Sequence, residues 1–214
     1  MIEIILKCLA SYLLGSLLGS LIVGRLRGGV DIRELGSGNA GGTNALRTQG
    51  KMFAVAVLLI DVGKGLIATR IIASLHVPGV APSMSGEWLP ALCGLAAIVG
   101  HIYPVWYGFR GGKGAATLIG ALLGIDAWLL APMLITWLAF VALSGYVGFA
   151  SIAAAVALPI FVVTSAYEPR EPLLMFGLIA AGLILFTHRS NIARMRAGIE
   201  PRAQRLWILR RGRE

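Results

Sequence analysis

The sequence predicts an all-α integral membrane protein, a bundle of seven transmembrane helices. Three observations predict this class. Of the 214 residues, 57% are hydrophobic and only 14% are charged, with a mean hydropathy of +0.80, which is too apolar for a soluble domain that needs a polar surface. Long apolar runs alternate with short polar segments. The positive charge gathers in three of those segments, as expected of loops that face the cytoplasm.

Seven apolar runs can cross a hydrocarbon core of about 30 Å. Residues 1–24 lack a small-residue cleavage site, so a retained helix is expected instead of a cleaved signal. The uncharged stretch 127–167 would extend about 60 Å as one helix, so it must fold back, and 144–148 is the expected inner turn. Within one membrane domain over 1–214, the expected helices are 3–25, 52–76, 88–107, 115–130, 131–147, 149–166 and 172–188.

Charge predicts the orientation of these helices. Of the 19 Lys and Arg residues, 15 lie in or beside the segments 26–51, 108–114 and 188–214. By the positive-inside rule these segments are cytoplasmic, the N-terminus lies outside and the C-terminus lies in the cytoplasm. The basic tail should also favour anionic membrane lipid. The formal charge of +9 does not indicate nucleic acid, because no basic patch interleaves with aromatic residues in a soluble domain.

The first cytoplasmic segment is rich in glycine and in neutral hydrogen-bonding side chains. Glycines let backbone N–H groups approach a ligand closely, and an arginine adds a fixed positive fork. This composition suits an oxyanion. A flexible connector between helices is the alternative, and two further polar clusters on the same face favour the binding site. The candidate ligands here are Ser37, Gly38, Asn39, Thr43, Asn44 and Arg47.

A second cluster surrounds a lysine flanked by glycines at the start of an expected helix. Exposed N–H groups at such a position could form an anion-binding nest. The spacing does not match a nucleotide P-loop, so the sequence predicts phosphate binding without nucleotide hydrolysis. The candidates here are Gly108, Arg110, Gly111, Gly112, Lys113, Gly114 and Thr117.

The third cluster contains His188 and Asn191, which share a face if the final helix continues past the membrane. His188 could donate to a phosphate or shuttle a proton, and Asn191 could orient a hydroxyl nucleophile. The sequence has no GxSxG elbow, no HxxxxD dyad and no metal-ligand spacing, so no metal or cofactor is expected. Such a site suits a substrate that is already activated, where positioning and charge stabilisation supply the rate.

Several polar residues fall inside apolar runs. Asp61 and Lys64 are three apart on one helical face, so mutual pairing would lower the cost of placing them in the bilayer. A place behind the active loop is the other interpretation of this pair. A structural hydrogen bond is expected for His101, and Cys8 and Cys93 are expected to be packing residues without a disulfide.

In these motifs the chain resembles the bacterial PlsY family of membrane acyl-phosphate:glycerol-3-phosphate acyltransferases. The likeness covers nearly the whole chain. The motifs that carry it are Gly36-Ser37-Gly38-Asn39 with Thr43-Asn44 and Arg47; Gly100-His101 through Pro104 to Gly111-Gly112-Lys113-Gly114 and Thr117; and His188-Arg189 with Asn191-Ile192, Arg194, Gly198 and Glu200. Asp61, Lys64 and Gly65 in the second expected helix fit the family as well.

The resemblance implies a reaction and a place in the cell. A fatty acyl group would pass from acyl phosphate to the 1-hydroxyl of glycerol 3-phosphate, giving lysophosphatidic acid and phosphate, the first acylation of phospholipid synthesis. The protein would lie in the bacterial inner membrane with its site facing the cytoplasm, and an upstream enzyme would supply acyl phosphate.

The resemblance also implies roles for particular residues. Phosphate groups would be held by Ser37, Arg47 and Lys113, and the glycines of the second motif would shape the glycerol 3-phosphate site. The acceptor would be oriented by His188 and Asn191, completing five catalytic residues, with a substrate phosphate helping to take the proton. A bracing role is implied for Glu200.

Departures from the family pattern are mild. Gly42 stands where alanine is common, Tyr103 and Trp106 replace phenylalanines, and Arg110 replaces a frequent lysine. None removes a catalytic group, and the aromatic changes bear on acyl-chain preference.

Two rival hypotheses are a transporter or flippase for a phosphorylated metabolite or lipid, and an enzyme subunit with no activity of its own.

Overall fold

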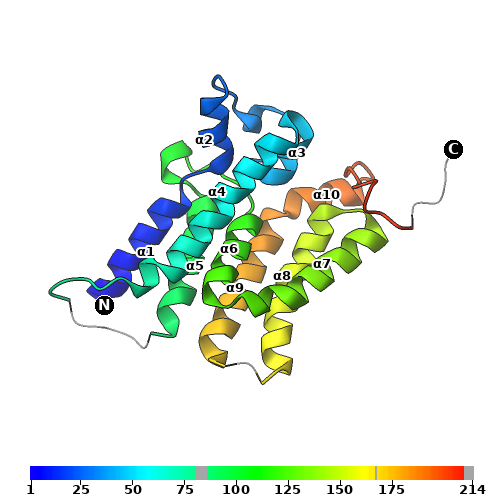
Figure 1. The fold of residues 1–214 in the computed structure, drawn as a ribbon. Helices are drawn as coiled ribbons and strands as arrows, with labels where there is room; N and C mark the ends of the chain where they lie inside the picture. Colours follow the sequence, from blue (N-terminus) through cyan, green and yellow to red (C-terminus); the bar gives the residue numbers. More distant parts are fainter. Residues whose placement is uncertain (81–85, 167, 210–214) are drawn as a thin grey trace. The chain divides into compact units, whose positions relative to one another are not determined.

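The computed structural model describes residues 1–80, 86–166 and 168–209, and every regular element in these ranges is a helix (Figure 1). The chain comprises two compact units, and the single membrane domain over 1–214 stays a prediction. The N-terminal unit comprises Met1–Ala127 and the C-terminal unit comprises Trp128–Glu214. Each unit is described by itself.

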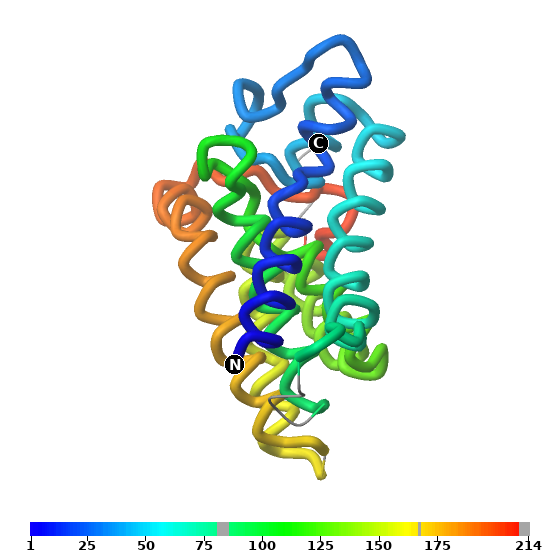
Figure 2. Tube along the Cα trace, turned by 90° about the vertical axis from the view of Figure 1, so that its left-hand side faces the viewer, coloured from blue at the N-terminus to red at the C-terminus, as the bar shows by residue number. Residues whose placement is uncertain are grey.

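The N-terminal unit is built around α4, a helix of 20 residues (Lys51–Arg70) that packs against five other helices of the unit. Figure 2 shows α4 (cyan) alongside α1 (dark blue). The remaining elements are α1 (Ile2–Gly15), α2 (Gly19–Leu26), η1 (Ile32–Glu34), α3 (Gly42–Gln49), η2 (Ile72–Ser74), α5 (Trp88–Ile102), η3 (Val105–Tyr107) and α6 (Ala115–Ile125).

Glycines bring the backbones of these helices into contact. A Cβ added to Gly65 of α4 would overlap the carbonyl oxygen of Thr117 in α6, and one added to Gly120 would overlap that of Val62. A Cβ on Gly15 of α1 would likewise overlap the carbonyl oxygen of Ala97 in α5. Such close approach is how helices associate in lipid, where van der Waals contact replaces the hydrophobic drive.

The C-terminal unit contains three long antiparallel helices and a short one. Helix α8 (Val147–Thr164) packs against both α7 (Leu130–Ser144) and α9 (Arg170–Thr187), and α10 (Arg189–Arg196) contacts α8 and α9. A 3-10 turn, η4 (Ala127–Leu129), precedes α7. The expected inner turn lies at Gly145, whose φ of 75° is in the left-handed region that ends helices.

The first expected helix, 3–25, is wrong as a continuous segment. It breaks into α1 and α2, bent by 43°. The break is filled from α4: Lys64 Nζ donates to the Leu17 carbonyl at 2.8 Å, and the Gly19 N–H donates to Asp61 Oδ1 at 3.1 Å. Because these side chains satisfy the backbone groups freed at the break, the helix can bend inside an apolar run.

Two expected helix ends and two expected loops also change. Helix α5 ends at Ile102 and not at 107, because Tyr103 precedes Pro104, which disfavours helical geometry there. Helix α6 ends at Ile125 and not at 130, since Asp126 is extended. The segments expected as loops 26–51 and 188–214 contain α3 and α10.

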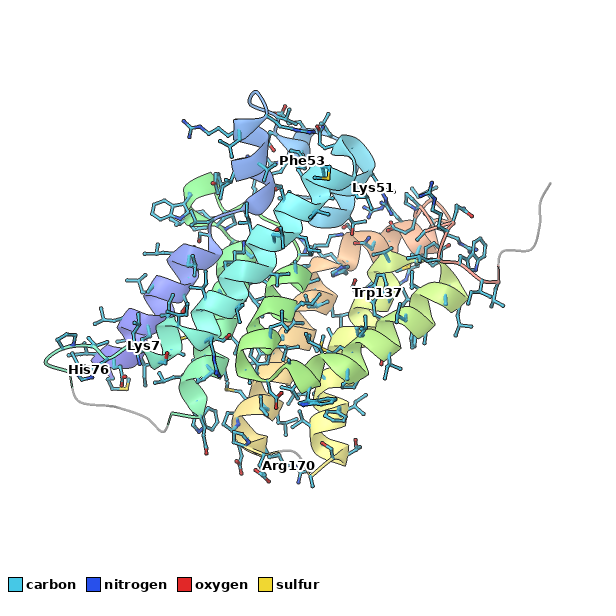
Figure 3. All side chains as sticks on the ribbon, viewed as in Figure 1. Lys7, Lys51, Phe53, His76, Trp137 and Arg170 are labelled. Atoms are coloured by element: carbon cyan, nitrogen blue, oxygen red, sulfur yellow. The ribbon has the colours of Figure 1, made fainter. Side chains whose placement is uncertain are left out.

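Five described helical segments are long and apolar enough to cross a membrane. The bent pair α1–α2 passes the same test as a sixth span, and α6 is a shorter apolar helix. The five are Lys51–Ser74, Trp88–Tyr107, Ala127–Ser144, Val147–Thr164 and Arg170–Thr187. In the N-terminal unit, Lys7 and His76 lie at one end, and Lys51 and Phe53 lie at the other (Figure 3).

Candidate functional site

The first glycine-rich segment is folded around the side chain of Asn44, which is 2% exposed. Its Oδ1 accepts the N–H of Ser37 at 3.0 Å, and its Nδ2 donates to the carbonyls of Ile32, Leu35 and Asn39 at 2.9–3.0 Å. The amide predicted to bind substrate is therefore used by the segment itself. Asn44 gives the loop its shape through these four hydrogen bonds, and the substrate contact predicted for it stays a prediction.

The other first-motif candidates surround this anchor. Ser37, Gly38, Thr43 and Arg47 are exposed, and Asn39 is partly buried. Thr43 and Arg47 lie four apart on α3, a spacing that places them on one face of the helix. The Ser37 N–H is tied to Asn44 near the start of α3, and Arg47 lies three residues after Asn44 on the same helix.

Arg33, which in the sequence is only one of the positive charges that set the orientation, joins the first segment to the second. Its Nε and Nη2 donate to the Asp31 carboxylate at 2.7–3.1 Å, and its Nη1 donates to the carbonyls of Tyr107 and Arg110 at 3.1 and 3.0 Å. The adjacent guanidinium lowers the pKa of Asp31, and the carboxylate raises the pKa of Arg33. Its signal in the sequence was the Asp31-x-Arg33 spacing, since Asp31 also accepts the Arg33 N–H.

The segment after α5 folds back onto the end of that helix. The N–H groups of Phe109, Gly111 and Gly112 donate to the carbonyls of Pro104, Ile102 and His101 at 2.9–3.1 Å. Two of these carbonyls belong to the last turn of α5, which would otherwise lack partners. The nest predicted from exposed N–H groups is therefore wrong for Gly111 and Gly112. Their amides cap α5 instead.

The remaining second-motif candidates have different surroundings. Gly108 and Arg110 are exposed, and Lys113 is partly buried. Gly114, with a φ of 89°, precedes the first residue of α6. Thr117 has no exposed surface, and its carbonyl oxygen lies against Gly65 of α4. Its side chain is buried, and the substrate contact of Thr117 stays a prediction.

The predicted pairing of Asp61 with Lys64 is confirmed at 3.0 Å, with both side chains buried. The structural hydrogen bond predicted for His101 is also confirmed, because its Nδ1 lies 2.8 Å from Lys64 Nζ. Cys8 is partly buried and Cys93 is buried, and both lie within helices, as expected of packing residues. The polar group formed by Asp61, Lys64 and His101 lies directly behind the second motif.

In the C-terminal unit, His188 sits where α9 ends and α10 begins, and it is 5% exposed. Its Nδ1 lies 2.7 Å from the carbonyl oxygen of Ile184. Because a carbonyl can only accept, Nδ1 carries the proton. A neutral imidazole in this tautomer has its basic lone pair on Nε2.

The orientation of Asn191 is set by a residue beyond α10. Asn191 Nδ2 donates to Glu200 Oε1 at 2.7 Å, and Arg194 Nε donates to Glu200 Oε2 at 2.6 Å. Glu200 is 6% exposed, so this carboxylate is braced on both oxygens. A Cβ on Gly148 of α8 would lie 2.8 Å from Asn191 Nδ2, so α8 also confines the amide.

The segment 199–209 caps the end of α7. The N–H groups of Ala203 and Ile208 donate to the carbonyls of Gly145 and Ala142 at 2.7 and 2.9 Å, and Trp207 Nε1 donates to that of Leu143 at 3.2 Å. The Arg202 guanidinium stacks on the rings of Tyr146 and Trp207 at 4.6 and 4.1 Å. Glu200 belongs to this segment, and its N–H donates to the Arg194 carbonyl at 3.2 Å.

The candidate residues thus fall into two groups, one in each unit. Within the N-terminal unit the structure brings the first and second motifs together through Arg33. Within the C-terminal unit it brings Asn191 and Glu200 into contact. The meeting of all three clusters stays a prediction.

Comparisons with known proteins agree on one family. A family model described as glycerol-3-phosphate acyltransferase matches residues 5–198. A glycerol-3-phosphate acyltransferase of Synechococcus sp. (strain CC9902) is 41% identical over 192 residues, covering 89% of this chain and 90% of the relative. The protein of that name from Coxiella burnetii (strain CbuG_Q212) is 40% identical over 200 residues, covering 94% of this chain and 98% of the relative.

Two crystal structures of PlsY, an integral membrane glycerol 3-phosphate acyltransferase, match the fold. The glycerol 3-phosphate form has a TM-score of 0.82 and 33% identity, covering 93% of this chain and 94% of that one. The lysophosphatidic acid form has a TM-score of 0.81 and 32% identity, covering 95% and 97%.

Proposed function

Since this chain belongs to the glycerol-3-phosphate acyltransferase family, we propose that it transfers a fatty acyl group from acyl phosphate to the sn-1 hydroxyl of glycerol 3-phosphate. The chain is a membrane acyltransferase, and the family match over residues 5–198 is the observation that carries this conclusion. The names of the relatives favour this function over transport of a phosphorylated metabolite. The acyl-phosphate donor and the position of acylation are the proposed refinements.

The proposed chemistry needs little beyond positioning. The hydroxyl oxygen attacks the acyl carbon of a mixed anhydride, the new ester C–O bond forms, and the C–O bond to phosphate breaks. The hydroxyl proton ends on the released phosphate, so that lysophosphatidic acid and hydrogen phosphate are the products. Because the phosphate is a good leaving group, charge stabilisation and orientation supply most of the rate.

The residues of the N-terminal unit are proposed to hold the phosphate groups. Arg47 offers a bidentate fork and Ser37 a hydroxyl, both on the exposed surface that Asn44 shapes. Lys113 lies just before the N-terminus of α6, where a helix leaves N–H groups without intrahelical partners. A compact cation beside such a terminus suits a phosphate dianion.

The residues of the C-terminal unit are proposed to orient the acceptor. With Nδ2 of Asn191 committed to Glu200, the amide presents Oδ1 as its hydrogen-bond acceptor. With the proton of His188 on Nδ1, Nε2 accepts from the attacking hydroxyl. Both acceptors suit a hydroxyl that must lose its proton as it attacks.

We also propose seven crossings with the N-terminus outside. The five long apolar segments, the bent pair α1–α2 and the short α6 supply them. An odd number of crossings places the termini on opposite faces, and the excess of Lys and Arg in 26–51, 108–114 and 188–214 favours those segments on the cytoplasmic side of a bacterial inner membrane. An enzyme that forms acyl phosphate would then supply the donor from the same side.

The experiment that tests the reaction is a single-component assay. Purified protein in lipid should release phosphate from palmitoyl phosphate only when glycerol 3-phosphate is present, and lysophosphatidic acid should form in equal amount. Acyl-CoA and acyl carrier protein should be poor donors. Equal rates with acyl-CoA would overturn the proposed donor, and release of phosphate without glycerol 3-phosphate would overturn the coupled transfer.

A further inference from the structure

A buried polar group in the N-terminal unit has no part in the chemistry proposed above. Asp61, Lys64 and His101 are 1%, 3% and 2% exposed. They lie on α4 and α5, within segments apolar enough to cross a membrane. Charged groups at such depth are costly to keep, so their presence points to a task.

The hydrogen bonds fix the imidazole of His101. Lys64 Nζ has three N–H donors and three acceptors within reach: the Leu17 carbonyl at 2.8 Å, His101 Nδ1 at 2.8 Å and Asp61 Oδ1 at 3.0 Å. His101 Nδ1 also lies 3.5 Å from Asp61 Oδ1, farther than from Lys64 Nζ. With Lys64 as an ammonium group, which cannot accept a hydrogen bond, Nδ1 accepts from it and the ring proton lies on Nε2. The donor from Lys64 therefore sets both the tautomer and the direction of the ring.

The far edge of that ring lies against the glycine-lysine segment, residues 108–114. A Cβ added to Gly112 would overlap His101 Nε2, and the Gly112 N–H donates to the His101 carbonyl at 3.0 Å. Gly112 is bonded directly to Lys113. The imidazole edge is thus a wall that determines where the backbone leading to Lys113 can lie.

Lys64 and Asp61 also contact the break between α1 and α2. The Leu17 carbonyl and the Gly19 N–H are bound by Lys64 and Asp61. One buried cluster therefore ties the α1–α2 break, α4, α5 and the glycine-lysine segment into one rigid frame.

We propose that Asp61, Lys64 and His101 form a positioning triad, in which Lys64 aims the imidazole of His101 so that its edge sets the place of Gly112 and Lys113 for phosphate binding. This inference rests on the proposed function. His101 is a positioning residue in this scheme, since it acts on substrate through Lys113. Loss of the wall should raise the KM of a phosphate-bearing substrate, while kcat, which depends on His188 and Asn191, changes little.

Two substitutions of His101 separate its two contacts. In His101→Asn the amide oxygen can occupy the position of Nδ1 and accept from Lys64, but the edge against Gly112 is gone. In His101→Gln the side chain can reach Gly112 but offers no acceptor at the Nδ1 position. Each should raise the KM of glycerol 3-phosphate or acyl phosphate at least fivefold, with kcat within threefold of the wild type.

The decisive measurement is a double-mutant cycle with Gly112→Ala. The added methyl overlaps Nε2, so Gly112→Ala alone should raise the same KM at least tenfold. In the double variant His101→Asn/Gly112→Ala the methyl occupies the vacated space, and the KM should fall to within threefold of His101→Asn alone. Gly63→Ala on α4, where a Cβ would meet nothing within 4 Å, is the matched control and should match the wild type.

The outcomes are distinguishable. A KM in the double variant close to that of His101→Asn alone supports the role of the imidazole edge. A KM increase equal to the product of the two single increases overturns it. A fall in kcat with an unchanged KM also overturns it. If Gly112→Ala alone fails to fold, the double variant decides. Restored folding and substrate binding in the double variant support the triad, and the absence of such recovery overturns it. A wild-type protein without acyl transfer would refute the proposed function instead.

Discussion

Asn44 illustrates at the scale of one residue how a polar side chain can give a site its shape. Its amide makes four hydrogen bonds to the backbone of the segment that carries Ser37. A buried amide that is fully used in this way gives a glycine-rich segment one shape. The exposed Ser37 and Arg47 then keep a fixed relation to each other.

Asn44→Ala should therefore loosen the first segment. Leaving buried carbonyls without donors costs about 1–3 kcal/mol of unfolding free energy, and kcat/KM should fall at least tenfold because Ser37 loses its anchor. Thermal unfolding in detergent and steady-state kinetics check this. Thr48→Val, which removes only a hydroxyl bonded to the carbonyl of Asn44 within α3, should change kcat/KM by less than threefold. Equal effects of the two variants would contradict the role.

Asp31 makes the same segment sensitive to acid. Arg33 holds the folded pKa of this carboxyl below its unfolded value of about 3.9. The ion pair therefore stabilises the segment fully above the unfolded pKa, and the contribution is lost as the pH falls through the folded pKa. Hydrogen exchange of residues 31–40, corrected for intrinsic rates, should speed up in that acidic range in the wild type.

The matched variants make this prediction specific. Asp31→Asn should exchange faster at neutral pH and lose most of the acid-dependent change. Glu34→Gln, which alters an exposed neighbouring carboxyl, should keep the wild-type profile. Wild-type behaviour of Asp31→Asn would show that the ion pair does not hold the segment.

At the scale of elements, the close contact between α8 and α10 governs Asn191. Gly148 has no side chain, and a Cβ there would lie 2.8–3.0 Å from three atoms of the Asn191 side chain. Because Glu200 fixes the amide from the other side, the side chain has no room to yield. The close approach of the α8 backbone at Gly148 therefore helps to fix the orientation of the Asn191 amide.

Gly148→Ala should therefore lower kcat at least tenfold with less than a threefold change in KM, because the misplaced amide affects orientation of the attacking hydroxyl more than phosphate binding. Gly182→Ala on α9, where a Cβ would meet nothing within 4 Å, is the control and should match the wild type. Steady-state kinetics with both substrates varied would decide. A rise in KM alone would place Asn191 in binding and not in orientation.

The local sequence pattern predicted a structural feature best where the interactions that produce the feature lie within one helix. The Asp61–Lys64 pair was predictable because two charges three apart in an apolar run need each other. The break after Gly15 was not predictable, because its cause is a pair of side chains more than 40 residues away. The amides of Gly111 and Gly112 were misjudged for a similar reason, since only the folded chain shows that they cap α5.

At the scale of the whole molecule, charge distribution and hydropathy predicted a helical membrane protein, and the motifs predicted its family. The part of the site that sequence could not supply is its scaffold. Arg33, the Asn44 anchor and the segment 199–209 act through backbone carbonyls, which leave no pattern of residue types. The roles of Ser37, Arg47, Lys113, His188 and Asn191 toward substrate stay predictions.

The predicted meeting of the three clusters at one membrane face can be tested by cross-linking. In a variant with Cys8 and Cys93 replaced by alanine, cysteines at Gly42 and Arg189 should be joined by a short bifunctional maleimide. Cysteines at Ser74 and Arg189, expected on opposite faces, should not be joined. Single-cysteine labelling confirms access in each case, and absence of the first product despite full labelling would contradict the predicted meeting.

The bonds between the α1–α2 break and α4 have a consequence for biogenesis. Besides pairing with each other, Lys64 donates to the Leu17 carbonyl and Asp61 accepts from the Gly19 N–H, so two charges of α4 also have backbone partners in an earlier segment. Lipid alone would tolerate those charges poorly. We therefore expect the first segment to stay close to the insertion site until α4 arrives, so that these backbone groups and side chains meet early.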